Sequence, residues 1–158
     1  MMRPDAKVAI AYGSNTMSEV AKVLCAKLTA YQQAGYPVSV SIVAEDIKEL
    51  KKRVPAKKSV DDYIREKMEH YFSDFDYAIF LFDVKGTATP EGETKSTPLV
   101  SSNLIYEYGL ASSAFINQEL KYVYCFAPEE ISGKALQYVK NLNFKYFCEL
   151  LADCPNSH

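Results

Sequence analysis

Glu107 is the side chain whose type and position point most directly to chemistry in this sequence. The apolar residues around it recur at helical spacing, with Leu104 and Tyr108 near the centre of the apolar face. Glu107 then falls at the edge of that face, one turn into the helix, where a solvated glutamate would be unexpected. A carboxylate at the border of a core, near a helix N-terminus, is a candidate for functional work. On these residues alone, a structural role for Glu107 is as well supported as a functional one.

Gly109 lies two residues further along, in the middle of the same expected helix. A glycine in a helix interior costs about 1 kcal/mol relative to alanine. Its presence therefore predicts close packing or the approach of a ligand.

The turn Gly13-Ser14-Asn15-Thr16 is a second candidate, because it follows an apolar strand pattern and precedes a helical one. Its glycine allows close backbone approach, and the free N–H groups at a helix N-terminus bind anions such as phosphate. The spacing matches neither a Walker loop nor the fingerprint G-x-G-x-x-G. An ordinary tight turn is therefore the slightly favoured interpretation of this segment taken alone.

Asp83 follows the strongest buried strand pattern in the chain, at 77–82. It could hold a ribose hydroxyl, although the capping of a turn is the commoner role of such an aspartate. The segment from Asp83 to about Ser101 is rich in Gly, Pro, Thr and charge, and it lacks apolar periodicity. This composition predicts a long structureless loop, either closing over a ligand or forming a surface insertion.

Composition excludes several kinds of chemistry. The only histidines are His70 and His158, so histidine-based catalysis and His-rich metal sites are almost excluded, and no metal site is predicted. Eighteen Lys and Arg against 20 Asp and Glu leave a formal net charge of −2, which favours binding neither to nucleic acid nor to a membrane surface. The four cysteines form no C-x-x-C pair, and no apolar run reaches about 18 residues. A reduced, cytoplasmic protein is expected.

Six of the 18 cationic residues fall within residues 48–58, at Lys48, Lys51, Lys52, Arg53, Lys57 and Lys58. Such runs are usually solvated faces. Contact with phosphate or with a protein partner is the alternative.

The elements that position these groups alternate between strand and helix. Strands are expected at 7–12, 38–42, 77–82 and 122–126, and helices at 16–31, 59–72, 104–115 and 133–141. Thr16 is expected to open the first helix in a capping box with Glu19, the strand at 38–42 to lie near an edge, and the strand at 122–126 to be central. The segment 144–151 is ambiguous. This order predicts an α/β fold, a flavodoxin-like three-layer sandwich with a mostly parallel central sheet, in a single domain spanning 1–158.

Three segments also share a recognisable pattern: VAIAYGS at 8–14, DYAIFLF at 76–82 and NLIYEYG at 103–109. Together they resemble the TIR-like family of bacterial antiphage systems, once described as predicted nucleotide-binding proteins and found fused to STING or other cyclic-nucleotide sensors. The resemblance covers about residues 7–130. Its most specific part is the heptapeptide from Asn103 to Gly109.

The resemblance implies a TIR-like fold and an NAD⁺ glycohydrolase that releases nicotinamide, with NAD⁺ as substrate and no cofactor. Glu107 would be the catalytic glutamate. The substrate-binding positions would be Gly13, Ser14, Asn15, Asp83 and Asn103. A carboxylate suits this chemistry because it stabilises the ribosyl cation formed when the N-glycosidic bond breaks, and neutral nicotinamide leaves without an acid catalyst.

The same resemblance implies activation by self-association within an antiphage signalling system. A cyclic-nucleotide sensor, STING-like or other, would lie in the same chain or in a separate protein. The domain at 1–158 is accordingly expected to be one working part of a larger assembly, either excised from a longer chain or acting with a separate sensor.

Three alternatives stay open. The first is a TIR-like interaction module without chemistry. The second is an enzyme similar to nucleoside deoxyribosyltransferases, whose E-x-G-x-A context is matched by Glu107-Tyr-Gly109-Leu-Ala111. The third is a flavodoxin, because Gly-Ser-Asn-Thr resembles an FMN phosphate loop, although the chain has no Trp to cover a flavin.

Overall fold

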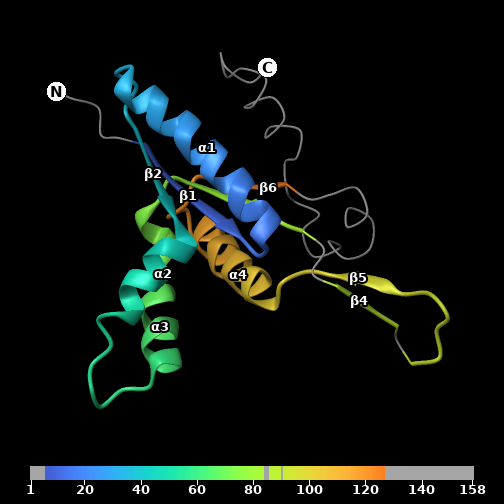
Figure 1. The fold of residues 1–158 in the computed structure, drawn as a ribbon. Coiled ribbons are helices and arrows are strands. Elements are labelled where there is room, and N and C mark those ends of the chain that lie inside the picture. Colours follow the sequence, from blue (N-terminus) through green and yellow to red (C-terminus); the bar gives the residue numbers. More distant parts are fainter. Residues whose placement is uncertain (1–5, 84–85, 90, 127–158) are drawn as a thin grey trace.

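The computed structural model describes residues 6–83, 86–89 and 91–126 (Figure 1). Within these ranges the elements, in chain order, are β1 (Ala6–Tyr12), α1 (Asn15–Gln33), β2 (Val38–Ile42), α2 (Val43–Lys51), α3 (Val60–Met68), η1 (a 3₁₀ turn, Tyr71–Asp74), β3 (Tyr77–Leu81), β4 (Gly86–Ala88), β5 (Thr97–Leu99), α4 (Ser102–Ile116) and β6 (Tyr122–Phe126). The expected helix at 133–141 and the ambiguous segment at 144–151 lie outside the described residues.

Four strands form a fully parallel sheet in the order β2-β1-β3-β6. β1 lies inside it and pairs with both β2 and β3, with Val8 opposite Val40 on one side and opposite Tyr77 on the other. The predicted parallel α/β fold is confirmed, and β2 lies at an edge among the described strands, as expected. The prediction that β6 is central is not met among the described strands, where β6 lies at the other end of the sheet.

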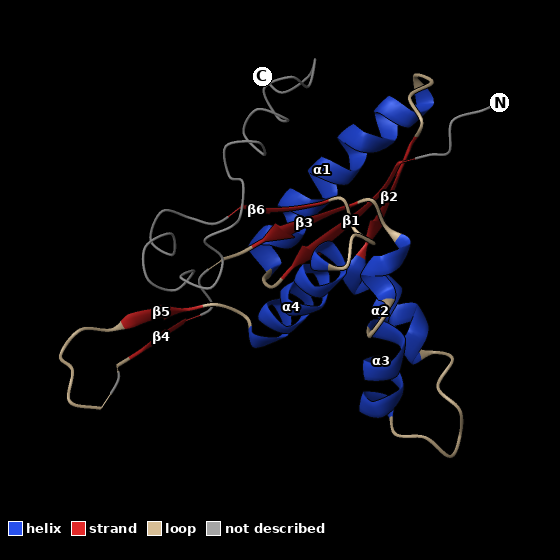
Figure 2. Ribbon diagram, turned by 180° about the vertical axis from the view of Figure 1, so that it is seen from behind, coloured by secondary structure: helices blue, strands red, loops and turns tan. Residues whose placement is uncertain are grey.

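Alternate side chains of the buried strands enter two separate cores, because neighbouring residues of a strand point to opposite faces. One core lies under α1 and contains Val8, Ile10, Met17, Ala21, Leu24, Ile79 and Leu81. The other lies under α2 and α4 and includes Ala9, Ala11, Val43, Met68, Ala78, Phe80, Phe82, Leu104 and Ala111. Figure 2 shows α1 on one side of the sheet and α2 and α4 on the other. The architecture is thus a flavodoxin-like three-layer sandwich.

Helices or strands also form in two stretches where none was predicted from the sequence. The polar residues after β2 form α2, whose first turn carries Glu45 and Asp46 and whose last turn carries Lys48 and Lys51. This charge order complements the helix dipole and stabilises a helix with few apolar residues. The expected loop behind β3 contains β4 and β5, an antiparallel pair that extends away from the sheet (Figure 1).

The helix starts also differ in part from the sequence prediction. The cap of α1 is Ser14 rather than Thr16: its Oγ accepts a hydrogen bond of 3.1 Å from the backbone N–H of Met17. Ser59 caps α3 as expected, accepting from the N–H of Asp62. α3 is shorter than expected and gives way to the separate turn η1.

Candidate functional site

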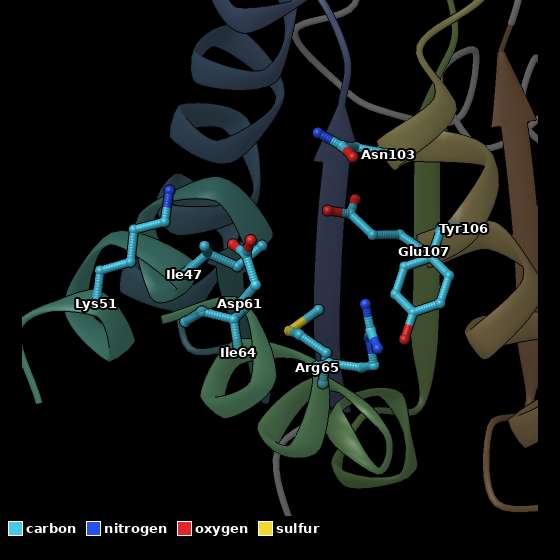
Figure 3. Close-up of a pocket in the computed structure, with 9 residues that line it drawn as sticks. Ile47, Lys51, Asp61, Ile64, Arg65, Asn103, Tyr106 and Glu107 are labelled. Atoms are coloured by element: carbon cyan, nitrogen blue, oxygen red, sulfur yellow. The ribbon is translucent and has the colours of Figure 1, made fainter. Parts of the chain in front are cut away.

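A pocket of about 460 Å³ lies between α4 on one side and α2 and α3 on the other (Figure 3). Its lining residues are Ile47, Lys51, Asp61, Ile64, Arg65, Met68, Asn103, Tyr106 and Glu107. Small-molecule sites usually have volumes of about 300–1,000 Å³ and combine an apolar lining with a few polar groups. This pocket has both properties.

The pocket has an apolar floor and a charged rim. Met68 is fully buried, and Ile47 and Ile64 are half-buried against the same core. Lys51 and Arg65 are exposed to solvent at the rim. The floor can therefore pack against the apolar part of a ligand, while the rim can bind its charged groups.

Glu107 extends from α4 into the space facing α2 and α3 (Figure 3). Its side chain is half-buried, and this burial raises the pKa of its carboxyl group from the ordinary 4.5 to about 7, because the charged form loses hydrating water. Within the described ranges, no hydrogen bond or salt bridge joins this carboxylate to another side chain. The group is available to a ligand.

A hydrogen bond between η1 and α2 lies near enough to Glu107 for its carboxylate to influence the donor. Tyr71 Oη donates to Asp46 Oδ2 at 2.5 Å and so joins η1 to α2. Burial raises the pKa of the Tyr71 hydroxyl, and the carboxylates of Asp46 and Glu107 raise it further. This bond therefore holds α2 in place beside the catalytic candidate while leaving the tyrosine un-ionised.

The two rim cations have no acidic partner in the described part of the chain, a property that they share with Lys48, Arg53 and Lys57. Lys52 pairs with Glu49 at 2.9 Å, and Lys58 pairs with Glu66. Lys51 and Arg65 form no such pair. Figure 3 shows the Arg65 side chain on the side of the pocket where α4 lies, and Lys51 on the α2 side.

The other residues predicted for the site lie at the carboxyl edge of the sheet. Ser14 Oγ donates a hydrogen bond of 3.0 Å to Asp83 Oδ2 and joins the ends of β1 and β3. Asn15 is exposed at the first position of α1. None of these three residues lines the pocket.

Gly13 is closely approached by the start of α4 within this chain, whereas the sequence prediction concerned the approach of a ligand. A Cβ on Gly13 would lie 2.6 Å from Ser101 Cβ and 3.4 Å from Leu104 Cδ2. Ser101 is buried and caps α4 through the N–H of Leu104 at 3.4 Å. The turn after β1 therefore fixes the helix that carries Asn103 and Glu107.

Gly109 does not show the close packing that the sequence predicts within this chain. It is exposed, and nothing described lies within 4 Å of a Cβ built on it.

The structure thus brings Asn103 and Glu107 together and separates both from the carboxyl-edge residues. The pocket residues that the sequence prediction missed come mainly from α2 and α3: Ile47, Lys51, Asp61, Ile64, Arg65 and Met68. One signal was present in the sequence, since Val43, Ile47 and Leu50 recur at helical spacing.

Comparison with known protein families found no match, and a search of curated proteins found no related sequence. In the described part of the chain, no group of three or more His, Cys, Asp or Glu side chains could hold a metal ion. No helix within these ranges has the length and apolar character needed to cross a membrane.

Proposed function

We propose that this protein cleaves the bond between nicotinamide and ribose in NAD⁺, with Glu107 as the catalytic carboxylate. The observation that carries the proposal is the half-buried Glu107 side chain, which faces a pocket of about 460 Å³ and has no partner among the described residues. Burying a carboxylate without a partner is unfavourable, and perturbed carboxylates concentrate at functional sites.

The reaction needs one carboxylate in its ionised form. As the C1′–N bond breaks, its electron pair leaves with nicotinamide, which departs as a neutral molecule. Positive charge develops on the ribosyl group, and the Glu107 carboxylate stabilises it. Water then adds to C1′, and its proton passes to Glu107 and on to solvent.

The positively charged nicotinamide ring also assists the ionisation of Glu107. A nearby cation favours the carboxylate form and lowers its pKa. Binding of the substrate therefore prepares the charge state that the reaction requires.

The remaining pocket residues fit this substrate. Ile47, Ile64 and Met68 provide an apolar floor for a flat ring. Asn103 lies one turn before Glu107 on the same helix, where its amide can hydrogen-bond a ribose hydroxyl. Gly13, Ser14 and Asp83 take a positioning role in this proposal, since they hold the edge of the sheet on which α4 begins.

The test is the release of nicotinamide by the wild type, by Glu107→Gln and by a control, Glu93→Gln. Glu93 is exposed in the segment between β4 and β5, so the same chemical change there leaves the pocket intact. We expect Glu107→Gln to lower kcat by roughly 10²–10⁴-fold, the range found for catalytic proton-transfer groups, and Glu93→Gln to leave it unchanged. Equal release by wild type and Glu107→Gln, or none by either, both with and without forced assembly of the chain, would sink the proposal.

From the sequence resemblance we extend the proposal to a cytoplasmic effector that is activated by self-association under a cyclic-nucleotide sensor. The assay is therefore run with and without forced dimerisation of the chain. Activity that stays full at high dilution, with no added partner, contradicts this extension.

Two competing functions give different results. A nucleoside deoxyribosyltransferase-like enzyme would exchange bases on free nucleosides, and an interaction module would self-associate without turnover.

A further inference from the structure

We infer that Arg65 binds a phosphate group of the substrate, so that the pocket selects nucleotides over phosphate-free nucleosides. The inference rests on the proposed function for the identity of the substrate. It does not rest on turnover, because phosphate binding can be measured without a reaction.

The first support is the orientation of Arg65. Asp61 lies four positions earlier on α3, the spacing at which a helical ion pair forms readily. No salt bridge joins the two residues. Figure 3 shows the Arg65 side chain turned toward α4 instead. Its guanidinium group therefore faces the pocket with all its donors open to a ligand.

Lys48, Arg53 and Lys57 have no ion-pair partner among the described residues either, but they do not line the pocket. Other cations near the pocket are held by neighbouring side chains. Lys58 is paired with Glu66, and Lys67 lies over the ring of Tyr63 at 5.6 Å. Arg65 lines the pocket and has neither kind of partner in the described part of the chain.

The chemistry of the side chain indicates which ligand it takes. A guanidinium group presents a planar fork of N–H donors that matches two oxygens of a phosphate. Lys51 adds a second positive charge across the same pocket.

The carboxyl edge of the sheet is a poorer place for the phosphate than the sequence alone indicates. The Ser14 hydroxyl already donates to Asp83 and accepts from the N–H of Met17. The Asp83 carboxylate would also repel an anion bound at the start of α1. In the pocket, the carboxylates of Asp61 and Glu107 are accompanied by two cations, Arg65 and Lys51.

The first measurement is the affinity of ADP-ribose, determined by titration calorimetry. ADP-ribose carries the pyrophosphate and is a product of the proposed reaction, so it is not consumed. Arg65→Gln is compared with Arg53→Gln, which removes an exposed arginine from the same basic region that does not line the pocket. A charged hydrogen bond contributes about 1.5–3 kcal/mol, so Arg65→Gln should weaken binding roughly 10- to 100-fold. Arg53→Gln should change it less than about twofold, as expected when no contact is lost.

The second measurement uses turnover. Arg65→Gln should raise KM for NAD⁺ while leaving kcat nearly unchanged, because the phosphate contact is kept in the transition state. Arg65→Lys should recover part of the ADP-ribose affinity, since it keeps the charge and loses the fork.

The outcomes separate this inference from the proposed function. Equal effects of Arg65→Gln and Arg53→Gln would show that Arg65 contributes only its positive charge, and would overturn the inference. The absence of ADP-ribose binding to the wild type would also overturn it. Selective loss of binding in Arg65→Gln, in a protein that releases no nicotinamide, would uphold the inference and reject the glycohydrolase. Both arginines are exposed, and thermal unfolding of each variant verifies that the fold is intact.

Discussion

Gly13 and Ser101 are packed so closely that a methyl group on Gly13 would lie 2.6 Å from the Cβ of Ser101. The contact joins the turn after β1 to the first residue before α4, although the two are far apart in the sequence. Real Cβ atoms do not approach to this distance, so a larger residue at position 13 must displace the start of α4. Asn103 and Glu107 would move with it.

The first prediction follows from this contact. Gly13→Ala should lower the free energy of unfolding by about 1–3 kcal/mol, the usual penalty for overpacking a core. It should also reduce catalysis, because Glu107 shifts with its helix. Urea denaturation and nicotinamide release measure the two effects. If Gly13→Ala is as stable as the wild type, α4 can move away from the turn after β1 at little cost, and the prediction is wrong.

Gly109 gives the opposite prediction on the same helix. A Cβ there meets nothing within 4 Å in the described structure, so Gly109→Ala adds helix propensity without a clash. We expect a gain in stability of about 0.5–1 kcal/mol with unchanged turnover. If turnover falls while stability rises, Gly109 is needed for an approach by a ligand or a second chain.

Ser14 has two functions that can be separated by a matched variant. It caps α1 and also donates to Asp83, whereas Ser59 caps α3 through the N–H of Asp62. Loss of a cap costs about 0.5–2 kcal/mol. Ser14→Ala should be more destabilising than Ser59→Ala, because it also removes the bond between the strand ends. Equal losses in chemical denaturation would mean that the Ser14–Asp83 bond adds nothing to stability.

The raised pKa of Glu107 predicts a pH dependence of catalysis. The ionised carboxylate is the active form, and its pKa in the free protein is about 7. The value of kcat/KM should therefore rise about tenfold per pH unit below this pKa and level off above it. The range from about pH 5 to about pH 8 extends roughly two units below and one unit above this pKa. A flat profile over that range would contradict a role for this carboxylate.

The same shift predicts a dependence of stability on pH. The pKa of Glu107 is raised in the folded state, so between about 4.5 and 7 the folded protein binds a proton that the unfolded chain has lost. The stabilisation is complete below the lower value and is lost as the pH rises through the higher one. Glu107→Gln abolishes this loss, and at pH 8 it should be more stable than wild type by up to about 3 kcal/mol. Urea unfolding at pH 4 and pH 8 gives the comparison, with Glu93→Gln as control. A difference that is independent of pH would contradict the shift.

The sheet could be predicted from the sequence because its strands are nearly continuous apolar runs. Residues such as Ile10 and Phe80 must be buried on a face of the sheet whatever surrounds them. Glu107 could be selected for a similar reason, since its position on a helix is fixed by local spacing.

The pocket could not be predicted, because it depends on how α2 and α3 pack against α4. α2 begins directly after β2 at Val43, without a capping side chain. Because the segment is also polar, its sequence carries no clear signal for the start of a helix. Without a predicted helix at 43–51, the sequence does not indicate where the Lys51 side chain lies. The role of Arg65 also requires the knowledge that Asp61 does not pair with it, and spacing along a helix predicts the contrary.

The arrangement of the parallel sheet has a consequence for the order in which the protein is built. The central strands β1 and β3 pair although β2 and the helices α1, α2 and α3 lie between them in the sequence, and the hydrogen bond from Ser14 to Asp83 spans 69 positions. Non-local pairing of this kind makes folding slow, because long loops must close before contacts repay their entropy. The walls of the pocket come from α2, α3 and α4 and meet only when the sheet that supports them is complete. The ability to bind a ligand would thus be among the last properties that the folding chain acquires. Ligand binding can therefore serve as a measure of complete folding.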